Sequence, residues 1–498
     1  MQLEIGVDPL VLTVSALLLA AVVTAAFAAR LGNVVRIPGA LLFLGIGMLV
    51  GEDGLGLLNL TDSELVRDIG IVALLVILFE GGLTTKPSDL RIAAVPGLVL
   101  STLGTALTAG ITALGVWLLL DVDPLTAALL GAVVASTDAA AVFSMMRTTP
   151  LPRRVSALLR IESGANDPIA VMLTVGLIAT LQGGPSGPGA WVSFAAVQLF
   201  GGVAAGLIVG SAGVALLRRI DLGIAGLYPV LAAAIGGLAY GIAAVLGASG
   251  FVAVYLAGVL VGARVPRHRR GIVGFHEAIA NAAEIGLFLI LGLLVFPSRL
   301  PAVAATGLAI AALLVLVARP VAVWLSTLGS GLDWRERTVV SWAGLRGAVP
   351  IVLATFPLTA GITGSAALFD IVFFVVLLSV LLQGTTLQAL VRWLGVEEAR
   401  PAWAPVAEAL PIDDLDVDLI ELTVTDDLAI VDRQLAEVGP PGSGRVMAVV
   451  RAHRVLVPTG QTVLHDGDVL LLTCARQRER DVVAEVTAWA RGEDATDR

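Results

Sequence analysis

Residues 155–180 read VSALLRIESGANDPIAVMLTVGLIAT, an apolar segment with a polar cluster at its centre. About 20 apolar residues suffice to cross the hydrocarbon core of a bilayer as a helix. On a helix, Glu162 and Asn166 share one face, and Ser163 and Asp167 share the adjacent face. Their carboxylate, hydroxyl and amide oxygens are hard ligands suited to an alkali cation. The segment therefore predicts a membrane helix that binds an ion, in preference to a purely structural polar cluster.

The composition of the whole chain agrees with a membrane location. The chain has 498 residues, of which 57% are hydrophobic and 14% are charged, and its mean hydropathy is +0.93. These values exclude a soluble globular protein. The net charge of −9 argues against a nucleic-acid partner, and a single cysteine, Cys474, excludes an internal disulfide framework. We predict thirteen apolar spans, at about 9–29, 37–51, 68–83, 92–119, 124–146, 155–180, 190–217, 223–246, 251–263, 271–296, 301–327, 336–357 and 367–394.

The distribution of basic residues between the spans predicts the orientation. Arg and Lys accumulate in cytoplasmic loops. Here they occupy every second loop, whereas the intervening loops carry only Arg67 and Arg299. We therefore expect a multi-pass protein of the cell membrane, with its N-terminus outside and, after thirteen spans, its C-terminal region in the cytoplasm.

Ionisable residues inside the predicted spans are informative, because burying a charge there costs at least ~2.5–3.5 kcal/mol. We interpret Glu284 and Asp370 as facing a water-filled crevice or lying near a span end. For Glu80, a functional role and a structural ion pair both remain open. The full set is Glu80, Asp138, Glu162, Asp167, Glu284, Arg346 and Asp370.

Two spans carry signs of interruption. In the fifth, Ser136, Thr137 and Asp138 can bond the backbone locally and support a non-helical break, although a straight helix with a paired Asp138 is the alternative. The twelfth reads WAGLRGAVP at residues 342–350, where two glycines and a proline surround a lone arginine, Arg346. Broken helices at these two places would have opposite polarity, as inverted-repeat transporters require.

Four motifs together resemble the monovalent cation:proton antiporter-1 family, the NhaP-type sodium or potassium/proton exchangers. They are FEGGL at 79–83, STD at 136–138, ESGANDP at 162–168 and GLRGAV at 344–349. The resemblance covers about residues 9–394. It implies a homodimer of thirteen-helix protomers in the bilayer, each with a dimerisation part and a six-helix core that moves like an elevator.

The resemblance also implies which residues bind the transported ions. The aspartate that matches Asp167 binds a monovalent cation and a proton in alternation. The residues that match Thr137, Ser163 and Glu80 help to form that site, and Asn166 marks the electroneutral branch. Burial favours a protonated carboxylic acid whereas a bound cation favours the ionised form, so that the two ions would compete for Asp167.

Three further residues have structural or electrostatic roles by the same resemblance. Glu162 is implied to pair with Arg346. Asp138 is implied to be the acid at the crossing of the broken helices. With Glu162 neutralised in this way, only Asp167 would need to change its occupant.

The C-terminal part of the chain differs from the rest in charge and in hydrophobicity. Residues 396–498 hold 20 of the 40 acids but only 10 of the 31 bases, and no long apolar run. We predict a membrane domain at 1–395, a linker at 396–415, a small α/β domain at 416–488 and a tail at 489–498. Within the small domain we expect strands at 419–424, 445–450, 454–457 and 469–473, and helices at 428–438 and 481–489.

This order of elements resembles the TrkA-C (RCK-C) regulatory domain of potassium-transport proteins. VPTG at 457–460 and LHDGD at 464–468 carry the resemblance. It implies a small regulatory ligand of nucleotide type. No GxGxxG follows a strand here, so a Rossmann subdomain is not expected.

The leading interpretation of the sequence is an electroneutral cation/proton antiporter and not an enzyme, since the spans hold no nucleophile–base pair. A ligand-gated cation channel is the alternative. The only filter-like sequence, TVGL at 174–177, lies within a span and lacks the following Tyr-Gly. The motifs leave K⁺ and Na⁺ open, and the regulatory domain favours K⁺ by analogy. No cofactor is predicted besides the transported ions.

Overall fold

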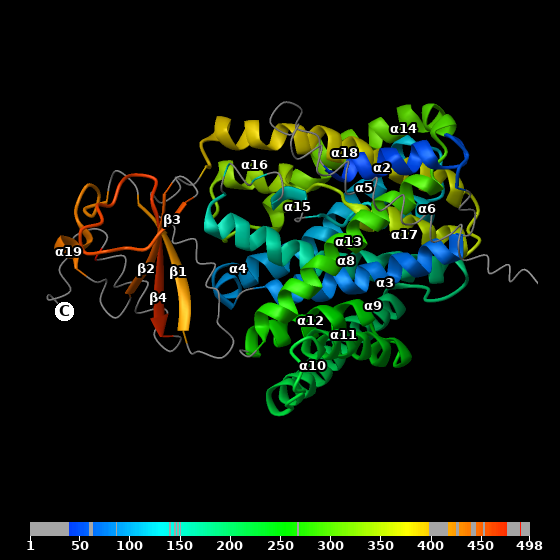
Figure 1. Cartoon of the computed structure of the whole chain (residues 1–498). Coiled ribbons are helices and arrows are strands. Elements are labelled where there is room, and N and C mark those ends of the chain that lie inside the picture. The colour runs from blue at the N-terminus through cyan, green and yellow to red at the C-terminus, as the bar shows by residue number, and fades with distance from the viewer. Residues whose placement is uncertain are drawn as a thin grey trace, which may run out of the picture. The chain divides into compact units, whose positions relative to one another are not determined.

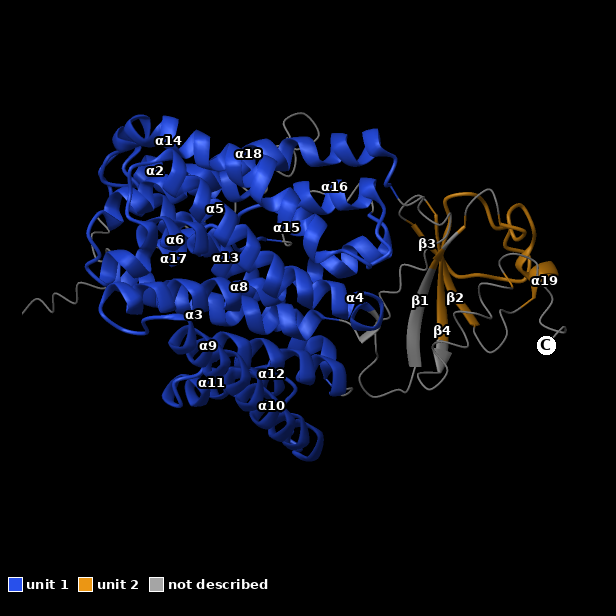
Figure 2. Cartoon of the chain, turned by 180° about the vertical axis from the view of Figure 1, so that it is seen from behind, with its two compact units in different colours: residues 1–397 blue, residues 398–498 orange. Residues whose placement is uncertain are grey.

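A computed structural model of the chain divides into two compact units, residues 1–397 and 398–498 (Figure 2). The structure describes residues 39–58, 63–85, 87–138, 141–143, 146, 149, 151–265, 268–397, 417–424, 428–439, 445–451, 454–475 and 489. Within these ranges the first unit is built of helices, and the second contains a small β-sheet.

The first unit is a bundle of apolar helices (Figure 1). Short π-helical turns join α4 to α5, α9 to α10 and α14 to α15 into continuous runs. Seven of the described helical runs are long and apolar enough to cross a membrane. The bounds are α2 (Gly39–Val50), α3 (Ser63–Thr84), α4 (Pro87–Val99), α5 (Thr105–Leu119), α6 (Pro124–Val133), α8 (Arg153–Leu181), α9 (Pro188–Ala196), α10 (Gly202–Arg219), α11 (Leu227–Val245), α12 (Gly250–Arg264), α13 (Arg269–Leu294), α14 (Leu300–Leu313), α15 (Arg319–Ser326), α16 (Trp334–Trp342), α17 (Ala348–Thr359) and α18 (Ser365–Leu394).

The predicted spans match these helices closely. Every apolar segment predicted from residue 37 onward overlaps one helix, one continuous run or one helix pair, and part of the segment 124–146 lies outside the described residues. The first predicted span, residues 9–29, lies outside the described residues. The polytopic helical fold is therefore confirmed, and the count of thirteen spans stays a prediction.

Both predicted interruptions are present. Helix α6 ends at Val133, and the chain is non-helical up to Asp138. Helix α16 ends at Trp342 and α17 begins at Ala348. The two breaks meet, because the backbone N–H of Asp138 donates to the carbonyl of Leu345 at 2.8 Å. By contrast, α8 runs unbroken through Pro168.

Glycines bring α3 and α12 into backbone contact. A Cβ on Gly258 would lie 2.5 Å from the carbonyl oxygen of Phe79, and one on Gly262 would lie 2.2 Å from that of Leu83. Neither distance is sterically allowed, so these positions need glycine for the helices to pack this closely. The FEGGL motif on α3 is thereby held rigidly, and Glu80 with it.

The second unit contains a four-stranded antiparallel sheet. Its strands are β1 (Val417–Thr423), β2 (Arg445–Arg451), β3 (Arg454–Leu456) and β4 (Val469–Ala475), in the order β1-β4-β2-β3. All four lie where the sequence predicts strands. Leu422, Val449, Leu464, Leu470 and Leu472 are fully buried in its core.

An ion pair between a half-buried arginine and a buried carboxylate joins β2 to the turn before β4. Asp468 accepts hydrogen bonds from Arg451, at 2.7 and 2.8 Å, and from the backbone N–H of His465. Burial of Asp468 by itself raises its pKa, but the hydrogen bonds from Arg451 and His465 outweigh burial and hold the pKa below its usual value.

The predicted helix at 428–438 is largely wrong. Only α19 (Leu435–Val438) is helical, and residues 428–433 form turns. The N–H of Asp432 donates to the carbonyl of Leu464, and the N–H of Leu464 donates to that of Arg433. These tertiary bonds use the backbone groups that a helix would have paired internally. The predicted linker and the helix at 481–489 lie almost wholly outside the described residues.

Candidate functional site

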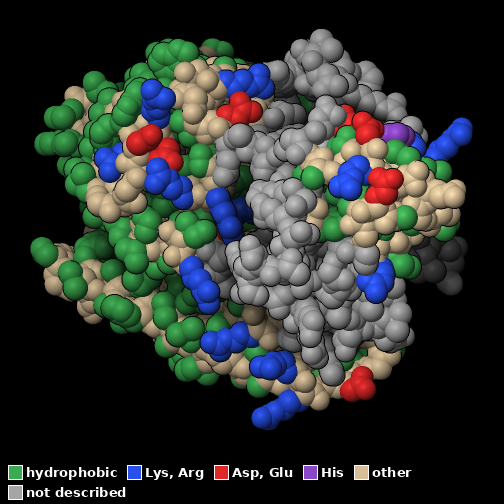
Figure 3. Space-filling view, turned by 90° about the vertical axis from the view of Figure 1, so that its left-hand side faces the viewer, with side chains coloured by type: hydrophobic (Ala, Val, Ile, Leu, Met, Phe, Trp, Pro, Cys, Tyr) green, Lys and Arg blue, Asp and Glu red, His purple; other side chains and the backbone are tan. Residues whose placement is uncertain are grey.

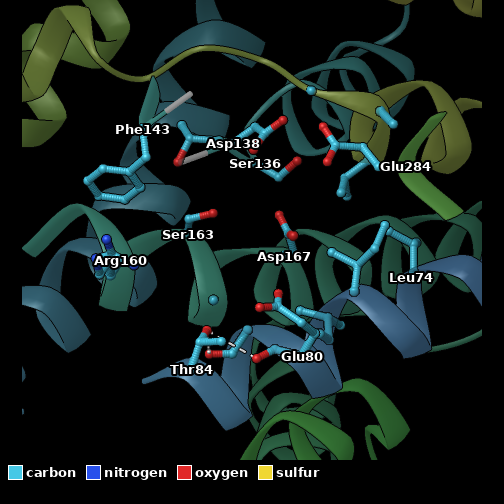
Figure 4. Close-up of a pocket in the computed structure, with 18 of the residues that line it drawn as sticks. Leu74, Glu80, Thr84, Ser136, Asp138, Phe143, Arg160, Ser163, Asp167 and Glu284 are labelled. Atoms are coloured by element: carbon cyan, nitrogen blue, oxygen red, sulfur yellow. Dashed lines mark hydrogen bonds between the residues drawn. The ribbon is translucent and has the colours of Figure 1, made fainter. Parts of the chain in front are cut away.

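A cavity of about 260 Å³ lies inside the first unit, close to the crossing of the broken helices. Two sets of helices line it: α3 and α13, and α8, α17 and the extended segment after α6 (Figure 4). Its described polar and charged lining residues are Glu80, Thr84, Thr85, Ser136, Thr137, Asp138, Arg160, Ser163, Asp167 and Glu284. Four carboxylates from segments far apart in the sequence thus share one cavity.

Asp167 lies at the middle of α8 and points into this cavity (Figure 4). The residue is only 7% exposed. Its Oδ1 finds no hydrogen-bond partner among the described residues. Ser163, one helical turn earlier, lines the same cavity, as the helical spacing predicts. A buried carboxylate oxygen without a partner is unfavourable, so Asp167 requires a proton or a cation.

Asn166 is fully buried and does not line the cavity, although it is next to Asp167 in the sequence. Its Nδ2 donates to the hydroxyl of Thr137 at 2.6 Å, and that hydroxyl lies 3.5 Å from Oε1 of Glu162. Asn166 therefore links α8 to the broken span, and Thr137 is shared between this network and the cavity wall.

The partner of Glu162 is Arg319 on α15. Arg319 binds the carboxylate through two hydrogen bonds. Its Nη1 donates to Oε1 of Glu162, and its Nη2 donates to Oε2 at 2.9 Å. Both side chains are almost completely buried. Gly344 makes room for the pair, because a Cβ there would lie 2.5 Å from Nε of Arg319. The expected pairing of Glu162 with Arg346 is therefore wrong.

Arg346 instead donates hydrogen bonds to backbone carbonyls. Its Nη1 donates to the carbonyl oxygens of Ala135 and Ser136, at 2.6 and 2.5 Å. These carbonyls follow the C-terminal end of α6, where the helix dipole places partial negative charge. The lone arginine of the second break thus stabilises the exposed backbone of the first.

Asp138 complements Arg346 at the same crossing. Its Oδ1 accepts from the N–H of Ala141 at 3.3 Å. A Cβ on Gly347 would lie 2.3 Å from Oδ2 of Asp138, so the carboxylate rests against the residue that precedes α17. The positive N-terminal end of a helix favours such a negative charge. Asp138 lies at the helix crossing, where the family resemblance places it.

The sequence does not predict the part that Arg319 plays here, or that Glu284 and Asp167 share one cavity. Arg319 lies inside the predicted span 301–327, and the rule that singles out buried ionisable residues applies to it equally. For Glu284, the sequence predicts a water-filled crevice or a span end, and the structure places it at a cavity, but the sequence does not indicate that this is the cavity of Asp167. Periodicity could not place α13 beside α3 and α17, because that is a matter of tertiary packing.

The cavity reaches the protein surface beside Arg160. This side chain is exposed, and its Cζ lies 4.2 Å from the ring centroid of Phe143 in a cation–π contact. Arg160 is the only basic side chain among the described residues that line the cavity. The described residues also contain no group of three or more His, Cys, Asp or Glu side chains placed to hold a metal ion.

The chain is similar to known antiporters over most of its length. It is 38% identical over 456 residues to the K⁺/H⁺ antiporter NhaP2 of Shewanella sp. (strain ANA-3), covering 90% of this chain and 78% of that protein. It is 36% identical over 470 residues to the K⁺/H⁺ antiporter NhaP of Alkalimonas amylolytica, covering 93% of this chain and 81% of that protein.

The fold is also known from experiment. The solved structure of the sodium proton antiporter MjNhaP1 from Methanocaldococcus jannaschii superposes with a TM-score of 0.66 at 24% identity. The match covers 78% of this chain and all of that one. At this identity the likeness establishes the fold alone.

Family models assign both parts of the chain. One described as "Sodium/hydrogen exchanger, transmembrane" matches residues 17–393, and one described as "TrkA-C domain" matches residues 419–486. The chain therefore belongs to the transmembrane sodium/hydrogen exchanger family, the monovalent cation/proton antiporters, and it also contains a TrkA-C domain.

Proposed function

We propose that this protein exchanges K⁺ for protons across the cell membrane without moving net charge, and that Asp167 binds either ion in turn. The observation that carries the proposal is the buried Asp167 carboxyl, which lines the cavity and whose Oδ1 has no hydrogen-bond partner among the described residues. A desolvated carboxylate must hold a proton or a cation. Each ion therefore displaces the other.

The surroundings of Asp167 support a one-for-one exchange. Its neighbour Asn166 is a neutral amide, so it cannot carry a second proton. Glu162, one turn earlier, is already neutralised by Arg319. Asp167 alone then changes its occupant on α8, and one proton replaces one monovalent cation. Ser163, Thr137 and Glu80 supply further oxygens at the cavity wall.

The cavity walls suggest how the site alternates between the two sides of the membrane. Asp138, Ser163 and Asp167 belong to the helices around the crossing, whereas Glu80 and Glu284 belong to α3 and α13. We propose that the first group moves like an elevator against the second. The protein would act as a homodimer, in which the moving parts are anchored by a fixed interface.

Exposed arginines support the predicted orientation. They lie in the first turns of α8, α13 and α16 and in the last turns of α10 and α12. In a bundle of alternating direction, these ends share one side of the membrane. Basic side chains are spread over the face seen in Figure 3. We assign this side to the cytoplasm, together with the TrkA-C domain.

The choice of K⁺ over Na⁺ rests on two similarities. The relatives at 36% and 38% identity are named K⁺/H⁺ antiporters, and the TrkA-C domain is typical of potassium-transport proteins. Na⁺/H⁺ exchange by the same site is the second candidate, because the solved structure of this fold is named a sodium proton antiporter. Proton flux from proteoliposomes, measured separately with KCl and NaCl, decides between them.

The central test is the variant Asp167→Asn. Asparagine can neither titrate nor supply charge, so we expect coupled flux to be abolished while the protein stays folded. The measurement is the dissipation of an imposed pH gradient in proteoliposomes after K⁺ is added. Asp370→Asn, which changes a buried acid on α18 outside the cavity, is the matched control. Substantial coupled flux in purified Asp167→Asn protein would overturn the proposal.

A further inference from the structure

Glu284 is a carboxylate at the ion cavity that the exchange mechanism above does not use. It lies on α13 and lines the cavity together with Asp167 and Asp138. Figure 4 shows its side chain directed toward Ser136 and Asp138. The carboxylates of Asp138 and Glu80 are both close enough to interact with it electrostatically. A carboxylate in this position can contact a cation held in the cavity.

Glu284 has no partner of its own in the described part of the chain. It makes neither a hydrogen bond nor an ion pair there, in contrast to Glu162, which Arg319 neutralises. The helices packed against α13, namely α2, α3, α11 and α17, contribute one charged group that faces it, Glu80. A structural role would require a donor or a cation in one of these places.

The carboxylates that line the cavity outnumber its basic side chains. Its four carboxylates face a single basic lining residue, Arg160. Asp138 is stabilised by backbone at the helix crossing, and Asp167 takes the exchanged ion. The charges of Glu80 and Glu284 remain, on the two helices opposite the crossing. Like charges at close range disfavour each other unless a cation or proton lies between them.

We propose that Glu284 is a second binding group for the transported monovalent cation, which attracts the cation to Asp167 and sets the pH at which Asp167 releases its proton. This inference rests on the proposed antiport function. It adds a ligand on the wall formed by α3 and α13. The spread of the carboxylates also suits a single hydrated monovalent ion, since the described residues offer no cluster for a tightly held metal.

The test is Glu284→Gln in the full-length protein, reconstituted into proteoliposomes. Loss of the charge weakens cation attraction, so the apparent KM for K⁺ should rise several-fold. Loss of the same charge lets a proton leave Asp167 more easily, so the pH of half-maximal exchange should fall by about half a unit. The maximal rate should stay close to that of the unchanged protein, because Asp167 is intact.

Glu277→Gln is the matched control on the same helix. Glu277 is exposed and does not line the cavity, although its charge acts on Glu80 from outside. Its variant therefore measures the long-range charge effect alone, and its KM for K⁺ should change much less than that of Glu284→Gln. If Glu284→Gln does not fold, Glu284→Asp decides, because it keeps the charge but withdraws it by one methylene. It should raise the KM and leave the pH profile in place.

The outcomes separate this inference from the proposed function. An unchanged KM and pH profile in Glu284→Gln, or an unchanged KM in Glu284→Asp when Glu284→Gln does not fold, overturns the role of Glu284 while the antiport assignment stands. No coupled flux in the unchanged protein overturns both. A raised KM in Glu277→Gln equal to that in Glu284→Gln would mean that the effect is a long-range charge effect, and it would also overturn the inference.

Discussion

Glu162 is a buried acid whose charge is matched by one residue from a distant part of the chain. Arg319 supplies both donors of a bidentate contact, whereas Arg346 is occupied by backbone carbonyls. Removing one member of a buried pair strands the other charge, which typically costs about 3–5 kcal/mol. Replacing both members of the pair with apolar residues of similar volume costs much less stability.

We therefore predict that Glu162→Gln and Arg319→Met each lower the thermal stability of the purified protein strongly. The double variant should be more stable than the sum of the two effects allows. The measurement is thermal unfolding in detergent as a double-mutant cycle. The matched cycle of Glu162→Gln with Arg346→Met should show a smaller coupling. A larger coupling with Arg346 would contradict the pairing observed here.

The two broken helices are the elements that build the site, and their contact tolerates no added atom. A Cβ on Gly347 would lie 2.3 Å from Oδ2 and 2.7 Å from Cβ of Asp138. Asp138 cannot retreat freely, because its own N–H is bonded to Leu345. The half-helices must therefore separate if Gly347 gains a side chain.

We predict that Gly347→Ala destabilises the protein by about 1–3 kcal/mol, the usual cost of overpacking, and lowers the exchange rate. Thermal unfolding and proteoliposome flux measure the two effects. Gly237→Ala is the control, since a Cβ there meets nothing within 4 Å. If Gly347→Ala behaves like Gly237→Ala, the crossing is looser than the contact distances indicate.

For the whole molecule, the proposed transport site and the proposed regulatory domain fall in different units. Every residue assigned to the ion cavity lies in the unit of residues 1–397, and the described part of the second unit is a small sheet with its own core. A regulatory unit can act only by binding one conformation of the transporter better than another.

We predict that a chain shortened after Ala399 still exchanges protons for cations, with a changed pH threshold or apparent cation affinity. Flux in proteoliposomes over a range of pH measures this, with the full-length protein alongside. Complete inactivity of the shortened chain, once it is shown to be folded and inserted, would make the TrkA-C domain an obligatory part of transport.

The sequence alone was sufficient to predict the features that depend on residues close together in the chain. Apolar length located the spans from residue 37 onward, and polar and glycine residues located both helix breaks. Helical spacing placed Ser163 and Asp167 on one face of α8. Alternating apolar residues located the four strands of the second unit. Each of these follows from residues that are near neighbours in the chain, so periodicity is enough to predict it.

Only the tertiary structure decided which distant residues meet. Arg319 and Arg346 are both single arginines in apolar spans, and nothing in their local sequence says which one Glu162 contacts. The cavity position of Glu284 depends on how α13 packs beside α3 and α17. The turns at 428–433 form because the segment around Leu464 takes their backbone hydrogen bonds. These contacts form between elements that are far apart in the sequence. Local sequence patterns therefore cannot predict them.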